Sequence, residues 1–99
     1  MTTYIGLINF TPQGLQNIHD SPHRANAFKA SAKKAGIKVR EIYWTLGAID
    51  GVIIFDAQGD DGATAAMLAL SGLGNVHTQT LRTFNAAEFA AILKKTPRL

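Results

Sequence analysis

The sequence predicts a single α+β domain in which helices cover one face of a four-stranded antiparallel sheet. Three observations lead to this fold class: two segments are apolar on both sides, two more are strand-like but mixed in polarity, and helical patterns lie between them. A chain of 99 residues with 46% hydrophobic residues fits one globular domain. We therefore assign residues 1–99 to one domain with its own core.

The four predicted strands differ in how much polar sequence they contain. Residues 3–10 and 52–55 are nearly all apolar, which is typical of central strands buried on both faces. Residues 37–46 alternate between apolar and polar side chains, and residues 75–84 are polar and rich in threonine. The last two segments are expected at the edges of the sheet. Within residues 37–46, successive side chains are expected to point to alternate faces along the whole strand.

Three helical segments are expected at about residues 22–35, 60–71 and 86–94. Ser21 before Pro22 is a start signal for the first helix, with Ser21 as its N-cap. Asn85 followed by Glu88 resembles a capping box at the start of the last helix. The resulting order, β-α-β-β-α-β with a C-terminal helix, is that of a ferredoxin-like sandwich.

This order leaves one sheet face without a helical layer. The two main helices cover only one face, yet the central segments have apolar residues on both. A bare apolar patch of this kind favours association, so we expect a homodimer or a higher oligomer. The alternative is that the C-terminal helix folds back over the patch.

Composition narrows the function classes that fit the chain. It has no cysteine, so it forms no disulfide and has no thiol nucleophile or thiolate metal site. Met1 is followed directly by strand-like sequence rather than a signal peptide, and no apolar stretch approaches the length of a membrane span. We expect a cytoplasmic protein without a membrane partner. The net charge of +3 is small and scattered, so a nucleic-acid partner is not expected.

Several motifs resemble the GYD domain family. They are the segment 43–47 (Tyr-Trp-Thr-Leu-Gly) with Asp50, and the segments 74–76 and 80–82. The opening part of the family is matched by Phe10-Thr11 with Gly14, by Ser21-Pro22 with Arg24, and by Ala27-Phe28-Lys29. The resemblance covers residues 3–93 and implies a dimeric α+β-barrel domain of bacterial type, without a known mechanism. One difference concerns the tyrosine that names the family, because Ile49 stands at that position. A role for its hydroxyl is therefore not expected here.

Two residues are candidates for acid–base chemistry. Asp50 follows a predicted turn and could act as a general base at a cavity mouth, or simply accept hydrogen bonds from backbone amides. His77 lies on a predicted strand, and histidine is a common residue in acid–base catalysis and metal binding. Tyr4, Tyr43 and Trp44 are aromatic residues with polar groups, which suit a ligand pocket or a packed interface.

No resident cofactor or metal is expected. The chain has no glycine-rich phosphate loop, no nucleophile elbow and no zinc-binding spacing. His19 and His23 are four residues apart, but Pro22 lies between them and restricts the helical geometry that a shared metal would need. The sequence therefore predicts a homo-oligomeric domain that binds a small molecule between sheet and helices. The alternative, which the resemblance to the dimeric α+β-barrel class implies, is a cofactor-independent enzyme such as a monooxygenase, isomerase or lyase.

Overall fold

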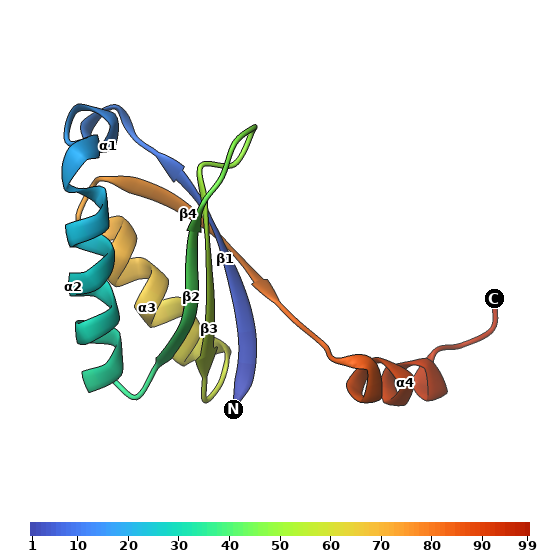
Figure 1. The fold of residues 1–99 in the computed structure, drawn as a ribbon. Coiled ribbons are helices and arrows are strands. Elements are labelled where there is room, and N and C mark those ends of the chain that lie inside the picture. Colours follow the sequence, from blue (N-terminus) through green and yellow to red (C-terminus); the bar gives the residue numbers. More distant parts are fainter.

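The computed structural model describes residues 1–99 and has the predicted α+β architecture. The strands are β1 (Thr2–Phe10), β2 (Lys38–Trp44), β3 (Gly51–Ala57) and β4 (Val76–Arg82). The helices are α1 (Pro12–Gln16), α2 (Ser21–Lys34), α3 (Asp60–Gly72) and α4 (Ala86–Lys95), with a 3-10 turn at Ile18–Asp20. Figure 1 shows α2 and α3 on the same side of the sheet, whereas α4 lies apart from it.

The sheet is antiparallel throughout, in the order β2-β3-β1-β4. The two strands that are apolar on both sides, β1 and β3, are central, and the mixed strands β2 and β4 form the edges. A central strand has a hydrogen-bonded neighbour on each edge and is more buried than an edge strand. Strands that are apolar on both faces therefore occupy the centre of the sheet. The ferredoxin-like fold class is confirmed.

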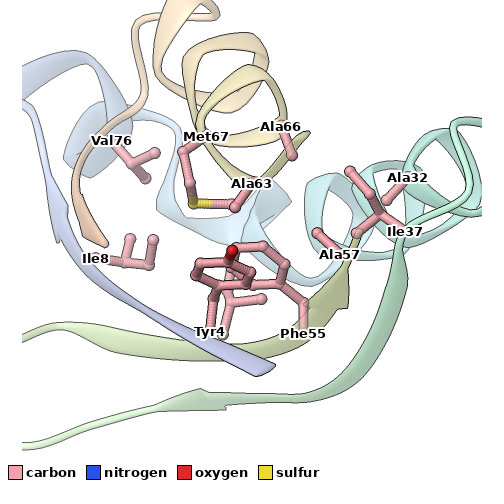
Figure 2. Close-up of a cluster of buried hydrophobic side chains, with 11 residues drawn as sticks. Tyr4, Ile8, Ala32, Ile37, Phe55, Ala57, Ala63, Ala66, Met67 and Val76 are labelled. Atoms are coloured by element: carbon pink, nitrogen blue, oxygen red, sulfur yellow. The ribbon is translucent and has the colours of Figure 1, made fainter. Parts of the chain in front are cut away.

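The core lies between the sheet and the two helices. Tyr4 and Phe55 are its largest fully buried side chains, and their rings stack with centroids 5.6 Å apart. Met67 of α3 extends toward this aromatic pair (Figure 2), and a β-carbon at Gly6 would lie only 3.2 Å from its sulfur. The Tyr4 hydroxyl donates a hydrogen bond to Asp60 at 2.7 Å, so the buried phenol has a partner.

Two local expectations are wrong. The alternation in β2 is broken by a bulge between Val39 and Glu41, so that Val39 and Ile42 both pair with core residues of β3. Ser21 is the first residue of α2 rather than its N-cap, because the 3-10 turn runs directly into the helix. The capping box at Asn85 and Glu88 is confirmed, with both reciprocal hydrogen bonds present.

The face of the sheet turned away from α2 and α3 is apolar and has no covering layer. We call it the open face; its central residues are Ile5, Leu7, Val52 and Ile54, paired as Ile5 with Ile54 and Leu7 with Val52. Each alternates along its strand with a core residue and so points to the opposite side. Tyr43 and Leu81 continue the open face onto the edge strands, and both are exposed.

The C-terminal helix does not cover the open face. Figure 1 shows α4 well separated from the sheet at the end of an extended connection. Its apolar residues Phe89, Ile92 and Leu93 are all exposed, and no residue of α4 is buried. The expectation that α4 could fold back over the open face within one chain is therefore not met.

One buried carboxylate lies at the end of the open face. Asp56 accepts hydrogen bonds from the Thr3 hydroxyl and from Nε of Arg40, each at 2.7 Å. The Thr3 hydrogen bond lowers the pKa of Asp56 most; burial opposes this effect, and Arg40 adds to the lowering. The folded protein therefore favours the charged form of Asp56 more than the unfolded chain does.

This pKa shift predicts a loss of stability in acid. Its stabilising effect is complete above the unfolded pKa of 3.8 and disappears as the pH falls through the lower folded value. We expect the free energy of unfolding, measured in urea between pH 7 and pH 2.5 or so, to fall more steeply below pH 4 in the wild type than in Asp56→Asn. Asp20→Asn, at an exposed carboxylate, is the control and should keep the wild-type slope. Equal slopes for Asp56→Asn and wild type would contradict the assignment.

Candidate functional site

A cavity of about 630 Å³ lies between the sheet, α2 and α3. Twenty of its 29 lining residues are hydrophobic, so its interior suits an apolar molecule. The helices reach the sheet separately: α2 packs against β2, and α3 packs against β3 and β4. The space between them is the cavity.

Alanine residues explain why this space is not filled by the protein itself. Both helices turn small side chains toward it; those in the lining include Ala25, Ala32, Ala66 and Ala69. An alanine ends at its β-carbon, so two helices that face each other through alanines leave room unless they approach closely. Phe28 of α2 and Leu70 of α3 are larger side chains that also belong to this lining. The cavity is thus a direct result of residue size on two helix faces.

Four of the polar residues in the lining come from the start of α2 and from the end of β2 and its connection to β3. They are Ser21, Arg24, Trp44 and Asp50. Trp44 donates from its indole Nε1 to the hydroxyl of Ser21 at 3.0 Å, which ties β2 to α2. The Trp44 side chain is about half exposed (49% for the residue), so it lies where the cavity meets solvent.

Asp50 has a clear structural role beside the cavity. Its Oδ2 accepts a hydrogen bond from the backbone N–H of Phe10 at 2.9 Å, and its own N–H donates to the carbonyl of Ile8. These contacts join the chain before β3 to the end of β1. The carboxylate therefore accepts a hydrogen bond from a backbone amide, which is one of the two roles that the sequence predicts for Asp50. Asp50 also belongs to the cavity lining.

The structure brings together only some of the candidate residues. Trp44 and Asp50 share the cavity. His77 pairs with Asn9 and is exposed on the same side as the open face, and Tyr4 is enclosed in the core, so neither lines the cavity. Tyr43 contributes to the lining, but its pairing with Val52 places its side chain on the open face.

Sequence reasoning did not select Ser21 or Arg24 as site residues. The sequence predicts Ser21 as a helix cap, and Arg24 belongs to the motifs that resemble the GYD domain family without a role being assigned to it. Arg24 follows Ser21 by three residues, and this spacing places both on one face of a helix. Combined with the strand that carries Trp44, that pattern could have indicated a shared site.

Possible metal ligands do not gather in this structure. No group of three or more histidine, aspartate or glutamate side chains lies close enough to hold an ion. No helix is long and apolar enough to cross a membrane.

The fold and the site define an α+β domain of ferredoxin-like order with an apolar cavity between its layers. The family model of the GYD domain matches residues 4–93. The chain belongs to the GYD domain family. Neither the curated proteins nor the solved structures include a significant match.

The role of Asp50 gives a stability prediction. Asp50→Ala should leave the N–H of Phe10 without its acceptor and lower the free energy of unfolding by about 1–3 kcal/mol. Asp50→Asn keeps a side-chain oxygen that can accept the same hydrogen bond, so its loss should be clearly smaller. Urea unfolding monitored by circular dichroism measures both. If the two variants were equally destabilised, the hydrogen bond to Phe10 would not be the source of the effect.

Proposed function

We propose that this GYD domain protein is a homo-oligomer that binds a small, mainly apolar molecule in the cavity between its sheet and helices. The observation that carries the proposal is the cavity itself, at about 630 Å³ with a largely hydrophobic lining. Ligand pockets in proteins have about this size and combine apolar walls with a few polar groups. Ser21, Arg24, Trp44 and Asp50 supply such groups.

Self-association is supported by the two apolar surfaces that one chain leaves uncovered. One is the open face and the other is the apolar side of α4. Leaving apolar area in water forfeits about 25 cal/mol for each Å². A second copy of the same chain is the occupant we propose, since it can cover both surfaces in one symmetric contact.

The size of the open face indicates how much of this contact the sheet supplies. Four strands spaced by about 4.8 Å, each with about seven residues rising 3.3 Å, span roughly 440 Å². A stable interface usually buries about 800 Å² on each partner. The 800 Å² is accessible surface, which exceeds the flat outline of the same face, so the sheet supplies a large part of such a contact. The exposed apolar residues of α4 can add to it.

The oligomer is tested by a charge placed in the open face. Leu7→Lys should shift the mass measured by light scattering toward that of the monomer, 10.6 kDa, because a buried ammonium would oppose the contact. Leu46→Lys is the matched control; Leu46 is fully exposed in the β2–β3 connection and should leave the mass unchanged. A chain truncated after Phe84 should associate more weakly than the full chain. If Leu7→Lys kept the wild-type mass, the open face would not be the interface.

Ligand binding in the cavity is tested by filling it. Ala69→Leu places a larger side chain on a residue of the lining and should weaken the binding of the dye 8-anilinonaphthalene-1-sulfonate at least about tenfold, since the added atoms occupy ligand volume. Ala30→Leu, on an exposed residue of α2 outside this cavity, is the control and should bind like the wild type. Equal dye binding by both variants would place the dye elsewhere.

A second candidate, a cofactor-independent enzyme, is favoured by one observation. Asp50 is an acid in the lining of a largely apolar cavity, where a carboxylate can serve as a general base. Only one of its two oxygens is engaged by Phe10. Fold alone says little about chemistry, so binding is the function that we place first.

A further inference from the structure

One cationic side chain in the cavity lining has an unsatisfied donor. Arg24 lies in the first turn of α2, and its Nη1 donates a hydrogen bond to the carbonyl of Asn17 at 2.8 Å. Its Nη2 is shielded from solvent and has no hydrogen-bond partner. Buried polar atoms in native proteins nearly always have a partner, and those that lack one require an explanation.

The chain itself offers no acceptor to this nitrogen. The ion pairs of the structure join Arg40 to Asp56 and Arg82 to Glu88, so Arg24 is not part of one. Asp50 is the only acidic residue in the cavity lining, and neither of its oxygens is hydrogen-bonded to Nη2 of Arg24. The guanidinium is charged at every physiological pH. A bound molecule with an acceptor group can supply the partner that Nη2 lacks.

We propose that the cavity takes an apolar molecule that carries one carboxylate, and that Arg24 binds this carboxylate. The inference rests on the proposed binding function and gives its ligand a chemical class. A planar guanidinium offers parallel N–H groups that match the two oxygens of a carboxylate. The hydrophobic majority of the lining accommodates the rest of the molecule. Medium-chain fatty acids and aryl-substituted carboxylic acids both have this chemistry.

Arg24 and its surroundings favour a carboxylate over a neutral head group. A ligand hydroxyl or ester oxygen could accept one hydrogen bond from Nη2 but would leave the positive charge of Arg24 without a counter-charge. The charge of Asp50 lies in the same lining, but its hydrogen bond to Phe10 reduces the repulsion that a second carboxylate would meet. A carboxylate satisfies both the hydrogen-bonding and the charge requirement of Arg24.

The test compares decanoate with decan-1-ol, which share a chain and differ in the head group. Trp44 is the only tryptophan of the sequence and lines the cavity, so its fluorescence reports binding at this site. We expect the wild type to bind decanoate more tightly than decan-1-ol. Arg24→Gln should weaken decanoate binding about tenfold or more and leave decan-1-ol binding unchanged.

Two further variants make the result specific to Arg24. Lys29→Gln removes the same charge from an exposed position of α2 outside this cavity and should bind both probes like the wild type. Arg24→Lys keeps the charge without the paired N–H groups and should show an intermediate affinity for decanoate. If thermal unfolding shows that Arg24→Gln is not folded, the affinity of Arg24→Lys for decanoate serves as the test instead.

The outcomes separate this inference from the proposed function. Equal affinity of the wild type for decanoate and decan-1-ol would overturn the carboxylate assignment while the binding function stands. Equal weakening by Lys29→Gln and Arg24→Gln would also overturn it, because general electrostatic attraction would then explain the preference. If neither probe changed the fluorescence of Trp44, both the assignment and cavity binding of apolar chains would be overturned.

Discussion

The coverage of the sheet by helices on one side only is the constraint on which the rest of this structure depends. Because β1 and β3 are central and apolar on both faces, the side that meets α2 and α3 becomes the core and the other side becomes the open face. Each 100 Å² of apolar surface left in water forfeits about 2.5 kcal/mol. A domain that is only marginally stable cannot easily bear such a loss. A second copy of the chain is the simplest way to avoid it.

The same two layers determine where a ligand can lie. The core is dense beneath α3, where Tyr4, Phe55 and Met67 pack together (Figure 2). Between α2 and α3 the alanine-rich helix faces leave the cavity instead. The domain therefore combines a rigid aromatic core with an apolar space bordered by polar residues at the start of α2. A binding role uses both properties, because the rigid part holds the cavity walls in place.

Much of the fold follows from patterns that are local in the sequence. Apolar runs and mixed runs predicted which strands are central and which are at the edges, and Asn85 with Glu88 predicted a capping box. The bulge in β2 was not predictable, because apolar and polar residues alternate along 37–46 and no local signal marks Arg40 as the residue left out of the register. Ser21 was assigned as a cap because the 3-10 turn before it has no sequence signal of its own.

The candidate site was harder to predict than the fold. Asp50 and Trp44 were selected from residue chemistry, and the structure places both in the cavity lining. His77 and Tyr4 were selected on the same basis but lie elsewhere, since the face on which a strand residue lies depends on register. Arg24 was not selected, because the burial of its Nη2 without a hydrogen-bond partner depends on three-dimensional packing and leaves no pattern in the sequence.

The dependence of the thermal unfolding midpoint on protein concentration tests the central claim most directly. If the open face is covered by a second copy, unfolding is coupled to dissociation, and the midpoint must rise as the concentration of the full chain increases. An unfolding midpoint that stays constant from micromolar to millimolar protein would contradict the account. The apolar surface of β1 and β3 would then be stable in contact with water.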